Sequence, residues 1–88
     1  IANTVMELSP HEEEIAGTLR QALKMAEDTF FRVLVRAKQL GELKNDKDPR
    51  ALARFLSTMM QGTIVMIKAG TPADVVNQTA ETALSILD

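Results

Sequence analysis

The chain has 88 residues, of which 45% are hydrophobic and 25% are charged, and its net charge at pH 7 is −2. This composition is typical of one small globular domain and excludes a disordered or fibrous chain. A net negative charge argues against nucleic-acid binding by this segment itself. The chain has no cysteine, and its longest apolar run, residues 64–67, is too short to span a bilayer. We therefore expect a cytoplasmic protein that does not contact a membrane.

Three dipeptides mark helix starts, because each places a capping side chain before a proline at the first helical position. These dipeptides are Ser9-Pro10, Asp48-Pro49 and Thr71-Pro72. Glu12 and Asp74 stand three residues after the first and third caps, where they would complete capping boxes.

Two glycines, Gly41 and Gly70, are typical of left-handed helix ends, and a polar turn with one apolar anchor, Leu43, follows the first of them. We interpret residues 1–8 as the end of an earlier helix. The predicted long helices cover residues 10–40, 49–69 and 72–87. No strand alternation is present, so the predicted fold class is an all-α helical bundle.

The first long helix carries one apolar stripe that we interpret as core. Its members are Ile15, Leu19, Ala22, Leu23, Ala26, Phe30, Val33, Leu34, Ala37 and Leu40. Phe31 and Val35 lie outside this stripe, beside charged residues. They are either half covered by neighbouring lysine and arginine stems or in contact with a missing segment or another chain.

The second helix carries two apolar stripes whose centres lie roughly 140° apart on a helical wheel. The stripes are Phe55, Met59, Gly62 and Met66, and Ala53, Leu56, Met60, Ile64 and Ile67. So wide an apolar arc must be covered from two sides. One chain lacks the surface to do so. Its first helix alone would be roughly 45 Å long, and the two shorter helices cannot cover that helix and each other as well.

We therefore predict that the last two helices pack against the same pair from a second copy, in an intermolecular four-helix bundle. Gly62 would then mark a close approach of two backbones, which offsets its cost of about 0.5–1 kcal/mol relative to alanine. The alternative is a glycine that is merely tolerated on a buried face.

The segment GELKNDKDPRALARFLSTMMQGTIVMIKAGTPADVVNQTAETALSIL resembles the C-terminal half of TetR-family transcriptional regulators. A Gly-Glu-Leu turn, an Asp-Pro helix start, a Gln-Gly pair and a Gly-Thr-Pro start for the last helix recur together there. NTVMELSPHEEEI resembles the short helix and turn that precede the long central helix of that family. The resemblance implies that residues 1–88 form a regulatory domain that dimerises and binds a small inducer. DNA binding would belong to an N-terminal helix-turn-helix domain that has no counterpart in this sequence.

The resemblance also implies which residues carry these functions. The dimer surface is expected to include Phe55, Met59, Gly62, Thr63, Met66, Thr79, Ala83 and Ile86. Sequence alone does not say which stripe of the second helix faces the partner, and we favour the stripe with Gly62. The remaining candidates for the inducer pocket are Met6, Met25, Thr29 and Phe30, since methionine adapts to irregular ligands and threonine offers a hydroxyl. Met25 and Phe30 are alternatively simple core residues.

The sequence contains no motif for catalysis, for a metal or for a cofactor. His11 stands alone in a first helical turn, and Ser57 and Thr58 have no histidine in sequence reach to activate them. We therefore expect no enzyme, no metal and no cofactor. Arg20, Lys24, Arg32 and Arg36 form a basic row that we interpret as a solvated face, with Asp28 paired to Arg32.

Two functions fit these observations. The first is the dimerisation and effector-binding part of a one-component transcriptional repressor. The second is a helical interaction module that uses the same apolar surface to bind another protein and takes no small molecule.

Overall fold

The computed structural model describes residues 9–88, and this part of the chain is entirely helical apart from its connections. The elements are α2 (Pro10–Gln39), α3 (Pro49–Lys68), α4 (Ala73–Leu84) and a 3-10 turn, η1 (Ser85–Leu87). The predicted all-α class is confirmed, and the three predicted helices are all present. The earlier helix predicted at residues 1–8 lies outside the described residues.

Two of the predicted helix starts are capped by side chains. Ser9 Oγ accepts a hydrogen bond from the backbone N–H of Glu12 at 3.2 Å. The Asp48 carboxylate accepts from the N–H groups of Arg50 and Ala51, at 3.0 and 3.4 Å. Both caps satisfy backbone donors that have no partner within the helix, so they fix where α2 and α3 begin.

Both predicted glycine stops adopt the left-handed conformation. Gly41 has a φ of 77° and Gly70 a φ of 79°, which side-chain-bearing residues adopt only with strain. After Gly41, the N–H of Glu42 donates to Ala37 O at 2.9 Å. This bond closes a Schellman motif, which satisfies the last carbonyls of α2 and turns the chain sharply towards α3.

The predicted Thr71 cap is wrong. The Thr71 N–H donates to Met66 O at 3.0 Å, so this residue completes the Schellman motif at the end of α3. Pro72, whose ψ is 144°, stands at the N-cap position of α4 and provides no side-chain hydrogen bond. Because one residue alone separates Gly70 from Pro72, Thr71 cannot both end α3 and cap α4. The predicted capping box with Asp74 therefore does not form.

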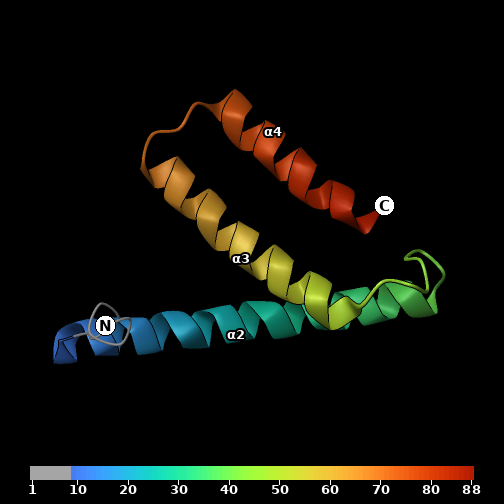
Figure 1. The fold of residues 1–88 in the computed structure, drawn as a ribbon, viewed down its shortest axis with the longest axis horizontal. Helices are drawn as coiled ribbons and strands as arrows, with labels where there is room; N and C mark the ends of the chain where they lie inside the picture. Colours follow the sequence, from blue (N-terminus) through green and yellow to red (C-terminus); the bar gives the residue numbers. More distant parts are fainter. Residues whose placement is uncertain (1–8) are drawn as a thin grey trace, which may run out of the picture.

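The three helices make an open arrangement rather than a closed bundle (Figure 1). α2 runs along the longest dimension, α3 leaves its C-terminal half at an angle, and α4 returns antiparallel to α3. The radius of gyration is 15.9 Å, whereas a compact chain of this length would have about 12 Å. We refer to α3 and α4 together as the α3–α4 hairpin. Most of the hairpin lies away from α2.

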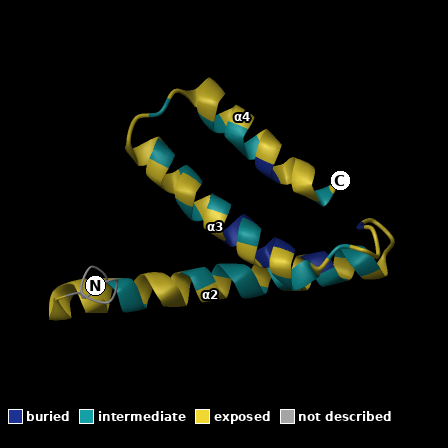
Figure 2. Cartoon of the chain, viewed as in Figure 1, coloured by how far each residue is buried: buried dark blue, intermediate teal, exposed yellow. Residues whose placement is uncertain are grey.

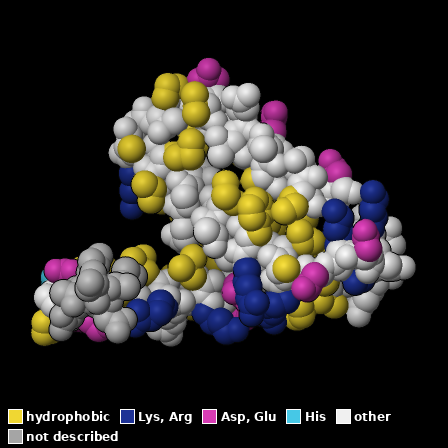
Figure 3. All heavy atoms as spheres, viewed as in Figure 1, with side chains coloured by type: hydrophobic (Ala, Val, Ile, Leu, Met, Phe, Trp, Pro, Cys, Tyr) yellow, Lys and Arg dark blue, Asp and Glu magenta, His cyan; other side chains and the backbone are white. Residues whose placement is uncertain are grey.

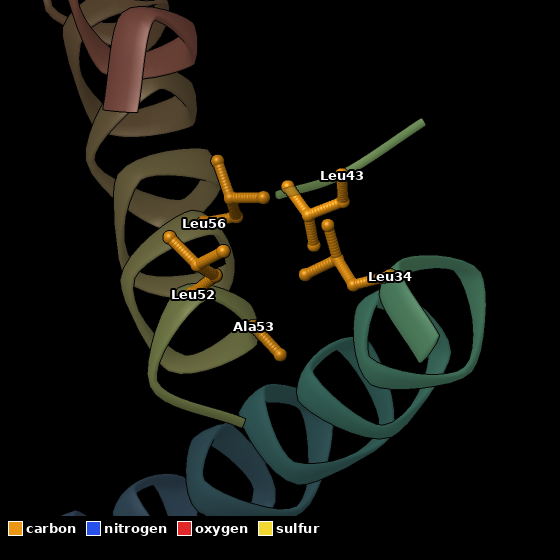
Figure 4. Close-up of a cluster of buried hydrophobic side chains, with 5 residues drawn as sticks. All are labelled: Leu34, Leu43, Leu52, Ala53 and Leu56. Atoms are coloured by element: carbon orange, nitrogen blue, oxygen red, sulfur yellow. The ribbon is translucent and has the colours of Figure 1, made fainter. Parts of the chain in front are cut away.

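The core lies where α3 crosses α2 (Figure 4). Leu34 from α2 and Leu43 from the turn meet one side of α3, which supplies the other buried members. These are Leu52, Ala53 and Leu56. The apolar anchor predicted in the polar turn is thus confirmed, because Leu43 is 5% exposed. Burial of this leucine holds the turn against both helices.

The prediction that the whole apolar stripe of the first long helix is core is wrong. Leu34 is its one buried member, whereas Ile15, Leu19, Val33 and Leu40 are exposed. Figure 2 shows exposed residues along the N-terminal part of α2, where no other described helix crosses it. The stripe is wider and longer than the surface that one crossing helix can cover.

Two leucines separated by two residues test this description of the core. We predict that Leu43→Ala lowers the free energy of unfolding by about 2–4 kcal/mol, because it leaves a cavity between α2 and α3. Leu40→Ala removes the same atoms from a side chain that is 55% exposed and should cost about 0.5 kcal/mol. Urea unfolding of both variants measures the difference. Equal losses would contradict the position of the core.

Candidate functional site

One side of the α3–α4 hairpin carries most of the predicted dimer residues. Four of them, Phe55 and Met59 from α3 with Thr79 and Ala83 from α4, line a shallow depression of about 280 Å³. Gly62 and Met66 continue the α3 row at helical spacing, and Ile86 continues the row of Thr79. We call this side of the hairpin, formed by Phe55, Met59, Gly62, Met66, Thr79 and Ile86, the Gly62 face.

The other side of the hairpin is apolar as well. Met60, Ile64 and Ile67 of α3 are exposed, Ile67 by 60%, and so is Leu84 of α4. These four side chains form what we call the Met60 face. A groove of about 180 Å³ between the helices opens beside it, and Thr63, predicted for the dimer surface, lines this groove. Met59 of the Gly62 face lines the same groove, so Thr63 lies between the two faces, next to α4.

Both apolar stripes of α3 therefore keep uncovered surface. Met60, Ile64 and Ile67 are exposed in one stripe, whereas the large side chains of the Gly62 stripe are half-buried. The buried side chains of α3 are Leu52, Ala53, Leu56 and Ser57, all in its N-terminal half. α2 crosses that half, and α4 lies beside Thr63, between the two stripes. The space-filling view shows hydrophobic side chains gathered over the hairpin between α3 and α4 (Figure 3). Contacts within residues 9–88 leave apolar surface uncovered on each side of the helix.

Gly62 has no neighbour in the chain that requires a glycine. It is exposed, and a Cβ added there would meet no atom within 4 Å. Its φ is not positive, so backbone conformation does not demand glycine either. The chain's own described contacts therefore provide no reason for the residue, which costs helix stability relative to alanine.

The candidate inducer residues divide between two sides of α2. Met25 is 66% exposed, and Thr29, one turn further on, is also exposed. Thr29 Oγ1 donates to Met25 O at 3.0 Å and accepts from Arg32 at 3.4 Å. Phe30 instead packs against the core and lines the groove beside the Met60 face. Met6 lies outside the described residues. We call the side of α2 that carries Met25 and Thr29 its outer face.

Arg50 joins α2 to α3 through a polar junction that sequence reasoning missed. Its Nη1 lies 2.9 Å from Glu27 Oε2 and 3.1 Å from Asp28 Oδ1, both on α2. Its guanidinium carbon lies 3.8 Å from the centre of the Phe31 ring, in cation–π geometry. Arg54 adds a longer contact, 3.5 Å from Glu27. The partners are more than twenty residues apart in sequence, so no local spacing could reveal them.

The structure gives Phe31 a cover that neither interpretation named. Its ring lies under the guanidinium of Arg50 from α3 and packs against the core. The predicted pair between Asp28 and Arg32 is wrong, because Asp28 binds Lys24 at 3.1 Å as well as Arg50. The Asp28 carboxylate therefore takes part in the junction with α3 and forms no ion pair with Arg32.

The charges of the junction shift the acid–base properties of its members. Hydrogen bonds from Lys24 and then Arg50 lower the pKa of Asp28 below its ordinary value. Hydrogen bonds to Glu27 and then Asp28 raise the pKa of Arg50. Both shifts favour the charged forms, so the junction is held by ion pairs throughout the neutral range.

The described residues present no metal centre and no membrane span. Histidine and carboxylate side chains nowhere come together in a group of three that could hold a metal ion within residues 9–88. None of the helices in this part of the chain has both the length and the hydropathy needed to cross a membrane.

Comparison with known proteins identifies the family. Residues 1–83 match the family described as Tetracyclin repressor-like, C-terminal domain. The chain is 35% identical over 89 residues to the uncharacterized HTH-type transcriptional regulator YezE of Bacillus subtilis, a match that covers 100% of this chain and 46% of that protein. It is 31% identical over 84 residues to the HTH-type transcriptional repressor ComR of Escherichia coli, covering 96% and 40%. No solved structure matches.

The chain therefore belongs to the TetR-repressor-like C-terminal domain family, as its sequence predicted. This is a family of transcriptional regulators and not of enzymes. The chain spans less than half the length of the two curated relatives.

Asp28 provides a pH test of the polar junction. Because its pKa is lowered in the folded protein, its ion pairs stabilise the protein above the unfolded value of about 3.8, and this stability is lost as the pH falls through the folded pKa. We predict that Asp28→Asn is less stable than the unsubstituted protein at neutral pH and equally stable in acid. Urea unfolding across this range measures the difference.

Asp46→Asn is the control, since Asp46 is exposed in the turn and makes no ion pair among the described residues. It should leave stability unchanged at every pH. A stability gap for Asp28→Asn that persists at acid pH would show that its carboxylate is not held in ion pairs.

Proposed function

We propose that this chain is the dimerisation and effector-binding domain of a TetR-like transcriptional repressor, with residues 1–88 acting as one regulatory unit. Two copies associate through the Gly62 faces of their hairpins. A small molecule binds beside α2 and relieves DNA binding by a helix-turn-helix domain elsewhere in the protein. The observation that carries this proposal is the apolar surface that α3 leaves uncovered on two sides, half-buried on the side of Phe55, Met59 and Met66 and exposed on the side of Met60.

Self-association is supported by the chemistry of the Gly62 face. A face of this kind would be costly to leave in water, and a twofold pairing covers it with an identical surface. The shallow depression between Phe55 and Ala83 offers a place for a partner side chain to insert. The open space around Gly62 allows a second backbone to come close. Together these features fit the intermolecular four-helix bundle that the sequence predicts.

Effector binding is supported by the position of the remaining apolar surface. The Met60 face and the exposed stripe of α2 lie away from the proposed dimer surface, so dimerisation leaves them free for other contacts. Met25 and Thr29 combine an adaptable thioether with a hydroxyl on the outer face of α2. The Arg50 junction connects this helix to the hairpin. A ligand that shifts α2 can therefore alter the position of the hairpin in the dimer.

Both relatives are named as HTH-type regulators, and one of them is named a repressor. We extend that role to this protein and place it in the cytoplasm, where DNA is bound. The second function considered from the sequence, a helical interaction module without a small molecule, would use the same hairpin. A complex with a different protein, in place of a dimer of identical chains, would favour that function.

Gly62→Leu tests the dimer surface. We predict that a leucine at this position raises the dimer dissociation constant by about tenfold or more, since overpacking a close contact costs about 1–3 kcal/mol. Helix content should stay the same, because Gly62 is exposed and a Cβ added there meets no other part of the described chain within 4 Å. Sedimentation equilibrium measures the association, and circular dichroism measures the helix content.

Gly17→Leu is the matched control, since Gly17 also lies inside a helix but far from the hairpin. It should leave the dissociation constant unchanged. Unaltered association of Gly62→Leu would place Gly62 outside the interface, and a protein that stays monomeric at high micromolar concentration would contradict the proposed dimer altogether.

A further inference from the structure

The outer face of α2 ends in a second depression, which has basic walls. Its volume is about 370 Å³, and it lies beside the C-terminal turns of α2. Its lining residues are Arg32, Val33, Arg36, Ala37, Leu40 and Glu42. Val33 is 62% exposed, so the apolar part of the lining is open to solvent rather than covered by the hairpin. Two arginines therefore flank an uncovered apolar surface.

The charges of these two arginines are not neutralised within the described part of the chain. The other basic residues of the predicted α2 row are paired, Arg20 with Glu13 and Lys24 with Asp28. Neither Arg32 nor Arg36 forms an ion pair with any carboxylate among residues 9–88, Glu42 included.

The contacts of Asp28 explain why Arg32 has no ion-pair partner among the described residues. Asp28 could have paired with Arg32 four residues on, but it faces the junction and binds Lys24 and Arg50. Arg32 instead donates a long hydrogen bond, 3.4 Å, to Thr29 Oγ1. Arg36 lies one turn further along the same face. Its position near the end of α2 suits the helix dipole, but the dipole does not account for Arg32.

Guanidinium groups recognise planar or tetrahedral anions through paired N–H donors, and apolar side chains beside them favour a hydrocarbon body. Arg32 and Arg36 stand on one face with Val33 and Leu40 between and beyond them. Thr29 links this depression to Met25, so the basic end and the candidate effector residues form one continuous face.

We propose that the effector is an organic anion, a carboxylate, phosphate or sulfonate with an alkyl or aryl body, whose charged group binds Arg32 and Arg36. Its apolar body lies along α2 against Val33 and towards Met25. This inference rests on the proposed function, in which the outer face of α2 is the effector side.

The test compares probes of equal length and different charge on the complete protein, including any sequence beyond these 88 residues. Octanoate, octanol and octylamine share one alkyl body, and naphthalenesulfonate and phenyl phosphate extend the anionic set. Isothermal titration calorimetry gives each dissociation constant. We expect at least one of the three anions to bind about tenfold or more tightly than octanol, because hydrogen bonds between charged groups are the strong ones.

The variant Arg32→Gln/Arg36→Gln should lose that tenfold preference. Lys44→Gln/Lys68→Gln removes the same two charges from exposed side chains that make no ion pair among the described residues, and it should keep the preference. The loss must appear in the affinity for the anion and not in the affinity for octanol, which a general disturbance of the fold would also lower.

Three results would overturn the proposal. Equal affinity for octanol and all three anions would show that a small molecule binds but that its negative charge contributes nothing to the affinity. No binding of any probe at about 1 mM would remove the anion site and the effector part of the proposed function together. A lower melting temperature of Arg32→Gln/Arg36→Gln without ligand, together with unchanged anion binding, would show that carboxylates of the protein itself neutralise the two arginines.

Discussion

The structure depends on the limited contact between α2 and α3. α2 crosses the N-terminal half of α3, which buries Leu52, Ala53 and Leu56, and then diverges from it. The rest of α3 still carries apolar side chains on two sides, and α4 covers only the surface between them. Residues 9–88 do not cover both sides, because the 30-residue α2 crosses α3 over a short stretch only. The proposed roles of the domain follow from this uncovered apolar surface. One uncovered side suits a second copy of the chain, and the surface beside α2 suits a ligand.

The Arg50 junction holds α3 against α2 at one end of this open arrangement. Leu34 and Leu43 supply the apolar contacts between the two helices, and Arg50 with Glu27 supplies the polar contact. Glu27 is largely buried, with 16% of its side chain exposed, so removing Arg50 would leave this carboxylate partly out of water with only the longer contact to Arg54. The hairpin is therefore attached to α2 at one end. An effector that shifted α2 would therefore shift the attached end of α3 and, by a larger amount, the far end of the hairpin in the proposed dimer.

Local sequence signals predicted the helices and which of their sides are apolar. Proline after a capping residue located the starts of α2 and α3, and two glycines located the ends of α2 and α3, because these features depend on neighbouring residues only. Thr71 was misassigned because two overlapping motifs compete for one residue. The apolar stripe of α2 was misread as core because periodicity shows which side is apolar but not what covers it. The Arg50 junction was missed because its partners meet only after α3 has folded across α2. For the site residues, spacing places Phe55, Met59, Gly62 and Met66 in one row, but it does not show that Thr63 lies in the groove beside α4. That this row meets a second copy of the chain stays a prediction.

The central claim is that the Gly62 face of one chain covers the Gly62 face of another. A mixed sample of the protein, in which one copy carries isotope-labelled methyl groups and the other does not, reports contacts between copies through filtered nuclear Overhauser effects. The account predicts such contacts from the methyl groups of Met59, Met66 and Ile86 to the ring of Phe55 in the other copy. Contacts between copies through Met60, Ile64 and Leu84 instead, or none at all, would contradict it.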